Sequence, residues 1–217
     1  LNPRSKIVFR LLTREKAETI DSSFFRRRIL QAFRFRSLWF KEKIEAYRMV
    51  NGEGDRLPGL IIDRYGRTLV IQCLTAGMEQ WKGEILEILI REFQPERIYE
   101  RNDTAARREE ELPSSKGLLY GKGEADPVVI REGDAFFNVG VQEGQKTGFY
   151  LDQREKRSLL RAISGGMSVL DACCYTGAFA VSAMAVTAAV SVMSTRTAMA
   201  VPPRPAISSA PLRAPSS

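Results

Sequence analysis

The chain has 217 residues, 44% of them hydrophobic, and a formal net charge of +7, which allows one large domain or two smaller ones. It contains no histidine, which excludes histidine-based triads, histidine metal sites and a histidine general base. Two of its three cysteines are adjacent, so they do not form the paired framework of a small secreted domain. The sequence therefore predicts a cytoplasmic protein with no metal site and no membrane span. The basic charge favours a polyanionic partner such as nucleic acid.

The first part of the chain predicts a strand and then a helix. Residues 2–13 alternate loosely between apolar and polar, which is typical of a strand. From Asp21 onward, a residue suited to capping a helix, apolar side chains recur at helical spacing. The apolar set is Phe24, Phe25, Ile29, Leu30, Phe33 and Leu38. We therefore expect an amphipathic helix to begin at residue 21 or 22.

The predicted helix also carries arginines and further aromatic residues. The arginines are Arg26, Arg27, Arg28, Arg34 and Arg36. They could contact RNA phosphates, or they could form a solvated helix face, and the sequence leaves both open. The aromatic residues Phe33, Phe35, Trp39 and Phe40 could stack on bases, but aromatic residues at helical spacing belong more often to a core, and we expect core here.

Strand patterns and a second helix follow. Residues 47–50, 60–63 and 69–73 are short apolar segments separated by turn residues, which predicts a β-meander. Met78 to Phe93 has apolar residues at helical spacing and is followed by Gln94–Pro95, which predicts an amphipathic helix that ends there. Residues 98–99 begin another strand.

The middle of the chain is charged and rich in glycine. Residues 102–113 carry many charges and are expected to be exposed, and residues 117–126 are expected to form a loop. A domain boundary is expected near residues 115–127. The segments 128–130 and 135–139 flank Glu132-Gly133-Asp134, which predicts a hairpin.

The rear of the chain predicts helix 154–163, strand 167–171 and a helix from residue 178, the opening of a doubly wound sheet. No acidic residue follows Asp171. Residues 188–217 have low complexity and are predicted to be a disordered tail that does not complete the sheet. Our hypothesis is a reading-frame shift near residue 185; a genuine disordered tail is the alternative. With the sheet half built, we expect the purified chain to aggregate or to show a disordered C-terminal third.

Two motifs and a central segment point to a known family. The first motif is Gly144 to Arg154, GQKTGFYLDQR, and the second is Val169 to Phe179, VLDACCYTGAF. With the segment Glu53 to Gly66, they resemble the class I ribosomal-RNA cytosine-5 methyltransferases that carry an N-terminal PUA domain. The resemblance covers roughly residues 2 to 184. Cys173 departs from it, because an aromatic residue is usual there.

The resemblance implies an S-adenosylmethionine (SAM) site and methyl transfer to a base of ribosomal RNA. The implied cofactor-binding residues are Thr147, Tyr150, Asp152, Arg154, Asp171, Cys174, Tyr175, Thr176 and Gly177. The residues themselves fit, because a strand ending in Asp171 and a turn through Gly177 leave backbone N–H groups free for a carboxylate. The family's catalytic cysteine and Asp-Pro-Pro segment lie downstream of residue 217, so no catalytic residue is assigned, and Cys173 and Cys174 are expected to be packing residues.

The predicted architecture has four parts. Residues 1–14 are the remnant of a PUA-like domain, 15–126 an α+β central domain, 127–187 the start of an α/β Rossmann-like methyltransferase domain, and 188–217 the tail. A chain cut in this way is expected to be inactive alone. The sequence does not decide whether the protein forms a homodimer. The alternative function is a non-catalytic basic RNA-binding fragment. A dinucleotide oxidoreductase is a third and more distant reading, because the loop after Asp171 lacks G-x-G-x-x-G.

Overall fold

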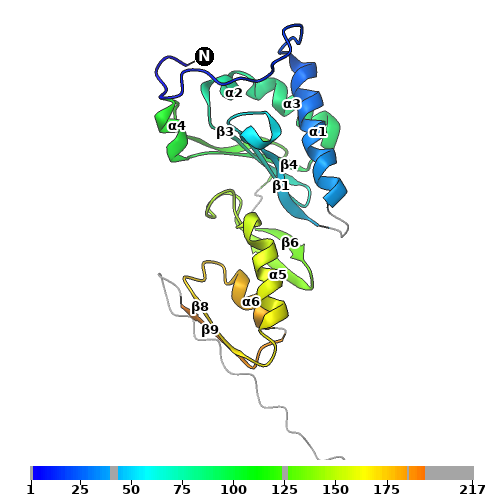
Figure 1. Cartoon of the computed structure of the whole chain (residues 1–217), viewed down its shortest axis with the longest axis vertical. Helices are drawn as coiled ribbons and strands as arrows, with labels where there is room; N and C mark the ends of the chain where they lie inside the picture. Colours follow the sequence, from blue (N-terminus) through cyan, green and yellow to red (C-terminus); the bar gives the residue numbers. More distant parts are fainter. Residues whose placement is uncertain (1, 40–43, 124–126, 185, 194–217) are drawn as a thin grey trace, which may run out of the picture. The chain divides into compact units, whose positions relative to one another are not determined.

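The computed structural model describes residues 2–39, 44–123, 127–184 and 186–193 (Figure 1). The chain divides into two compact units, residues 1–152 (unit 1) and residues 153–217 (unit 2). The four-part division expected from the sequence remains a proposal. Within the described ranges, no helix is long and apolar enough to cross a membrane.

Unit 1 is built on a mixed five-stranded sheet in the order β1-β2-β3-β4-β5. The strands are β1 (Ala46–Asn51), β2 (Leu60–Tyr65), β3 (Thr68–Cys73), β4 (Arg97–Asn102) and β5 (Ser115–Tyr120). The first three form the predicted meander, whereas β3 and β4 run parallel and are joined through helices. The sequence prediction missed β5, since it expected a loop from residue 117. This strand pairs antiparallel with β4 at the edge of the sheet.

Three helices, α1 (Ser22–Trp39), α2 (Ala76–Gln80) and α3 (Lys82–Phe93), lie over the sheet of unit 1 (Figure 1). Asp21 caps α1, because its carboxylate accepts the Phe24 N–H at 2.9 Å. The single helix expected from 78 to 93 is two helices divided at Trp81, and the second ends where Gln94 adopts φ 44°. The core between helices and sheet is formed by buried residues that include Phe24, Phe25, Ile29, Met49, Leu60, Ile62, Leu69, Ile71, Ile85, Ile88 and Leu89.

Two expectations about the first forty residues are wrong. Residues 2–13 form no strand and run as turns and irregular backbone, because side-chain bonds from Asn2 and Ser5 to Glu110 hold this segment in place of a strand ladder. The aromatic residues of α1 beyond Phe33 are not core: Phe35 is 56% exposed and Trp39 is 71% exposed. Phe40 lies outside the described residues.

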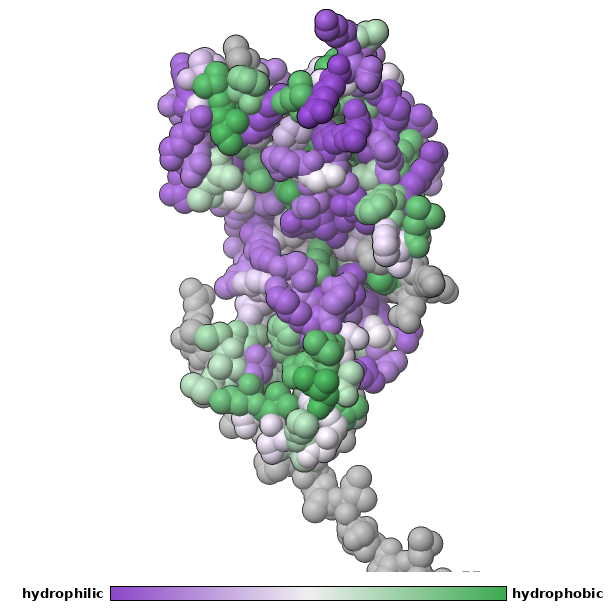
Figure 2. Space-filling view, in the orientation of Figure 1, coloured by the Kyte–Doolittle hydropathy of each residue, from purple (hydrophilic) through white to green (hydrophobic). Residues whose placement is uncertain are grey.

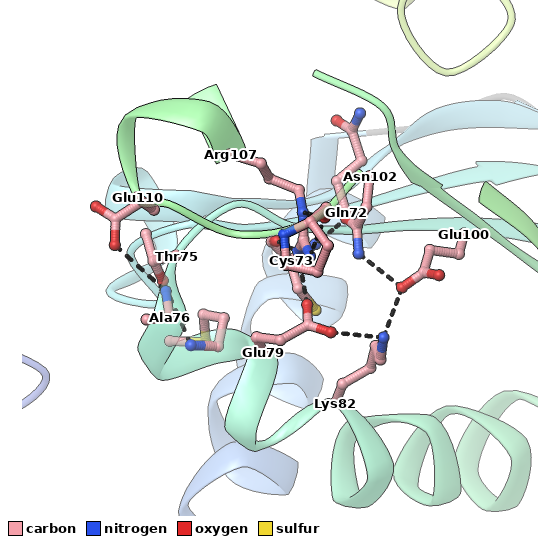
Figure 3. Close-up of polar contacts among 12 residues, drawn as sticks. Gln72, Cys73, Thr75, Ala76, Glu79, Lys82, Glu100, Asn102, Arg107 and Glu110 are labelled. Atoms are coloured by element: carbon pink, nitrogen blue, oxygen red, sulfur yellow. Dashed lines mark hydrogen bonds and ion pairs between the residues drawn. The ribbon is translucent and has the colours of Figure 1, made fainter. Parts of the chain in front are cut away.

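The charged segment 102–113 is not uniformly exposed, contrary to the expectation. It contains the short helix α4 (Ala105–Glu109), and Asn102, Arg107 and Glu110 are buried. Figure 3 shows Arg107 reaching Glu79 and the backbone of β3, with Lys82 joining Glu79 to Glu100. The charges are satisfied in pairs, which is the condition for burying them at acceptable cost.

Glu110 predicts a pH dependence of stability. Burial alone would raise its pKa, but hydrogen bonds from Ser5, Asn2 and the Ala76 N–H, together with Arg10, lower the pKa to about 2. A carboxyl group with a lowered pKa stabilises the folded state above its unfolded value near 4.5, and this contribution is lost as the pH falls toward 2. We expect up to about 3 kcal/mol of unfolding free energy to disappear across this window.

Glu110→Gln should remove most of this dependence. Urea unfolding at pH 6 and pH 3 would measure it, with the exposed neighbour Glu109→Gln as the control. An unchanged difference between the two pH values in Glu110→Gln would contradict the assignment.

A hairpin of β6 (Val128–Glu132) and β7 (Ala135–Val139) follows, as predicted, and belongs to unit 1. The Arg131 N–H donates to the Glu45 carboxylate at 2.7 Å, and the rings of Phe137 and Phe149 pack at 5.2 Å. The chain then runs through a loop to the short 3₁₀ helix η2 (Leu151–Gln153).

Unit 2 contains α5 (Arg154–Ile163), β8 (Ser168–Ala172), α6 (Ala178–Met184) and β9 (Ala189–Met193). Strands β8 and β9 are parallel and are connected through α6, which is the βα start that the sequence predicted. The tail prediction is wrong for residues 189–193, because they form β9. Apolar side chains that include Leu159, Leu170 and Met193 are more than half exposed, and this surface is hydrophobic in Figure 2.

Candidate functional site

The loop from β8 to α6 carries the second motif. Asp171 lies at the end of β8, and its Oδ2 accepts the Ala180 N–H in the first turn of α6 at 3.1 Å. The Cys174 N–H donates to the Met193 carbonyl at the end of β9, at 3.1 Å. The loop is therefore held between the carboxyl ends of two parallel strands and the following helix, where open α/β sheets bind ligands.

Three residues of this loop have left-handed backbone conformations: Cys173 at φ 63°, Tyr175 at φ 49° and Gly177 at φ 71°. Such conformations cost free energy for residues other than glycine. A Cβ atom on Gly177 would meet nothing within 4 Å, so no close packing in the protein requires glycine there. The backbone instead has open space on that side.

The polar groups of the loop are accessible. Cys173, Tyr175 and Thr176 are exposed, and Asp171, Cys174 and Gly177 are half-buried. Within the described residues no cluster of three or more potential metal ligands exists. The loop offers a carboxylate, a hydroxyl, a phenol, two thiols and backbone groups.

The first motif lies on a loop that unit 1 anchors. Arg101 of β4 donates to the Val141 carbonyl at 2.9 Å and to the Gly144 carbonyl at 3.0 Å. Gly144 and Gly148 pack so tightly that a Cβ on Gly144 would lie 2.8 Å from the Gly148 Cα. The sequence prediction did not identify Arg101, because nothing in its local pattern reveals a partner forty residues away.

A second anchor joins the loop to the sheet through Thr147. Its hydroxyl donates to Asp63 Oδ2 at 2.6 Å and lies 2.9 Å from the Tyr65 hydroxyl. Arg48 donates to both oxygens of Asp63, at 2.9 and 3.0 Å. Burial raises the pKa of Tyr65, which keeps its phenol protonated. Thr147 is 1% exposed. Because its hydroxyl is held by Asp63 and Tyr65, it has a structural role inside unit 1.

The other predicted residues of this motif are more accessible. Asp152 is exposed and accepts Lys146 Nζ at 2.8 Å, while the same ammonium lies 4.5 Å from the Tyr150 ring centre. The Tyr150 hydroxyl donates to Gln145. Arg154 is the first residue of α5 and belongs to unit 2. The structure thus brings Thr147, Tyr150 and Asp152 together on one loop, and Asp171 to Gly177 on another.

The five arginines of α1 differ in the ion pairs and hydrogen bonds that they form within the protein. Arg26 forms a two-pronged ion pair with Glu92, and Arg27 pairs with Glu18. Arg36 donates to Asp55 at 2.5 Å and to the Arg48 carbonyl at 3.0 Å, which makes it a structural residue. Arg28 reaches Glu18 only at 3.6 Å, and Arg34 forms no ion pair with another described residue. Their role toward RNA remains a proposal.

No family model matches the chain. Individual proteins do. The chain is 44% identical over 176 residues to the ribosomal RNA large subunit methyltransferase I of Shewanella amazonensis, which covers 81% of this chain and 44% of that protein. It is 43% identical over 179 residues to the protein of the same name from Shewanella frigidimarina, covering 82% and 45%. The chain therefore spans less than half the length of these curated relatives.

Solved structures of methyltransferases are also similar to this chain. A protein described as a SAM-dependent methyltransferase of Streptococcus mutans superimposes with a TM-score of 0.72 at 26% identity, covering 85% of this chain and 47% of that one. A second, described as a methyltransferase complexed with SAH, gives a TM-score of 0.70 at 26% identity and covers 82% and 46%. Over about four fifths of its length, this chain is similar in sequence and in fold to methyltransferases.

Proposed function

We propose that the chain is part of a SAM-dependent methyltransferase that acts on ribosomal RNA. The observation that carries this proposal is the loop after β8. Asp171 secures it to α6, left-handed residues shape it, and it lies in a chain 44% identical to a ribosomal RNA methyltransferase. The α+β description of unit 1 and the class I description of unit 2 belong to the same proposal.

The residues of unit 2 would hold the methyl donor in defined ways. Asp171 fixes the loop, Thr176 offers a hydroxyl, and Gly177 leaves room beside the backbone. When bound, SAM supplies an activated methyl group on a sulfonium. The sequence motifs assign further cofactor-binding residues, which are also proposals: Tyr150 and Asp152 on the loop of unit 1, and Arg154 at the start of α5.

The finer assignments inferred from the sequence are also proposals. They are a cytosine-5 target, a PUA-like segment at residues 1–14, a cytoplasmic location and lack of activity in this chain by itself. No described residue is assigned as the nucleophile. The thiol of Cys174 lies 3.9 Å from the Tyr175 carbonyl. The thiol of Cys73 is buried, which raises its pKa to about 12. A thiol that stays protonated at neutral pH is a poor nucleophile.

Calorimetric titration of the 217-residue chain with SAM and with SAH tests the cofactor assignment. We expect saturable binding that Asp171→Ala weakens at least tenfold, because the loop loses its link to α6 and the site loses a carboxylate. Glu155→Ala is the matched control, since it removes an exposed carboxylate of unit 2 from α5, and it should bind as the unsubstituted chain does.

The alternatives predict other results. No binding of SAM or SAH, combined with salt-sensitive RNA binding, would favour the non-catalytic RNA-binding fragment. A saturable titration with NADH would favour the oxidoreductase. Equal weakening by Asp171→Ala and Glu155→Ala would contradict the assigned site.

A further inference from the structure

Unit 1 contains a hollow lined by arginines. It has a volume of about 710 Å³ and lies where residues 7–15, α1 and the 3₁₀ helix η1 (Gly52–Asp55) meet. Four arginines line it, against two acidic residues. They are Arg10, Arg14, Arg28 and Arg56, and the acidic residues are Glu15 and Glu53. The excess of guanidinium groups favours an anionic occupant.

These arginines differ in whether they form ion pairs within the protein. Arg10 pairs with Glu110 at 2.8 Å and is a structural residue. Arg14 and Arg56 are exposed and form no ion pair with another residue in the described ranges. Arg28 stacks over the Phe24 ring, and its side chain is 11% exposed, yet its buried Nε has no hydrogen-bond partner there. The nearest carboxylate to this guanidinium is that of Glu18, 3.6 Å from Nη2, so Arg28 is only weakly paired and its charge contributes to the hollow that it lines.

A second hollow of about 270 Å³ extends the first along α1. Both are lined by Arg28 and Arg56, so the two hollows are adjacent at these residues. The second is also lined by Gln31 and Phe35. Residues 28, 31 and 35 follow the three- and four-residue spacing of one helix face, so the groove runs from the arginine cluster toward the end of α1.

At that end, α1 presents two aromatic rings to solvent. Phe35 is 56% exposed and Trp39 is 71% exposed, and their ring centres lie 6.1 Å apart. Large aromatic residues normally contribute to a core. On the face of unit 1 drawn in Figure 2, hydrophilic residues predominate, with several hydrophobic patches among them. Arg34, which forms no ion pair within the described ranges, lies on the same turn of the helix.

We propose that this α1 groove, defined by Arg14, Arg28, Arg56, Phe35 and Trp39, binds a single-stranded segment of RNA. The arginines would bind successive phosphates, and bases would stack on the two rings. A cationic groove with adjacent aromatic side chains is the arrangement that single-stranded nucleic acid requires. A duplex keeps its bases stacked inside and would not use the rings. The choice of RNA rests on the proposed function.

Fluorescence anisotropy with a fluorescein-labelled 12-nucleotide single-stranded RNA, without SAM, tests the arginines. We expect Arg14→Gln/Arg56→Gln to weaken binding at least tenfold. It should also lower the slope of log K against log salt by about 1.4, since each phosphate contact contributes about 0.7. Arg67→Gln/Arg108→Gln removes the same charge outside both hollows, and should change affinity less than threefold.

The rings are tested separately. Phe35→Leu/Trp39→Leu keeps apolar side chains but removes the stacking surfaces, and should weaken binding about 5- to 150-fold for each base that loses its stack, with an unchanged salt slope. Leu38→Ala is the control, because Leu38 is 77% exposed on the same turn, and should bind within twofold. Circular dichroism would confirm that each variant is folded.

Three results would overturn the groove: equal losses from the two arginine pairs, a duplex of the same length bound as tightly as the single strand, or no RNA binding. Because SAM is absent from these titrations, they are independent of the calorimetry. A chain that binds RNA in the groove but not SAM would contradict the proposed function alone.

Discussion

Arg107→Met is expected to lower the unfolding free energy of unit 1 by about 3–5 kcal/mol, the cost of breaking a buried charge network. The guanidinium is 1% exposed and donates to the Cys73 carbonyl, to Glu79 at 2.6 Å, and to the Pro113 carbonyl at 3.0 and 2.8 Å. Methionine fills similar space but donates nothing, so buried carbonyl groups lose their partner.

Urea unfolding followed by tryptophan fluorescence measures this change. The chain has two tryptophans, Trp39 and Trp81, and both belong to unit 1, so the signal reports that unit alone. Arg108→Met is the control, because the neighbouring arginine is exposed and its replacement should change stability by less than about 0.5 kcal/mol. Equal effects of the two substitutions would show that the network of Figure 3 stabilises nothing.

Asp63→Ala is the second large change and is expected to cost about 3–5 kcal/mol. The Asp63 carboxylate is fully buried and accepts Arg48 and Thr147. Its removal leaves Arg48 without its ion-pair partner and frees the loop of the first motif from β2. Amide hydrogen exchange across residues 144–150 should therefore accelerate, in addition to the loss of global stability.

Two further variants separate these effects. Thr147→Val removes only the hydroxyl, and its effect should be strongly non-additive with Asp63→Ala, because both act on one interaction. Glu143→Gln is the control on the same loop, since Glu143 is 76% exposed and, among the residues that the structure describes, pairs with Lys116 alone. If Asp63→Ala left exchange in residues 144–150 unchanged, the loop would not depend on this anchor.

Periodicity predicted the elements whose apolar faces are buried. Helices α1 and α3 follow from spacing, since each buries one apolar face. Strand β5 was missed because it lies at a sheet edge, contains Gly117, and leaves Leu118 and Tyr120 more than a third exposed. Its strand conformation depends on pairing with β4, which its own sequence does not show.

The sequence predicted where the second motif lies in the fold, but not the long-range contacts around the motifs. The motif around Asp171 lies on a loop after a strand, as its residues indicated. Long-range partners were not predictable: nothing in the charged run 102–113 reveals that Arg107 bonds Glu79, and nothing near Thr147 points to Asp63. The exposure of Phe35 and Trp39 was also missed, because helical spacing alone does not say where an apolar stripe leaves the core.

The anchoring of the first-motif loop matters for anyone recombining this chain with its relatives. Arg101 and Asp63 come from the sheet, while Gly144 and Thr147 come from the loop. A chimera joined at residue 127 would combine sheet and loop from different parents and would require both halves of each bond to match. A junction after Asp152 transfers the four residues as a set, so we expect such hybrids to keep the parental loop geometry.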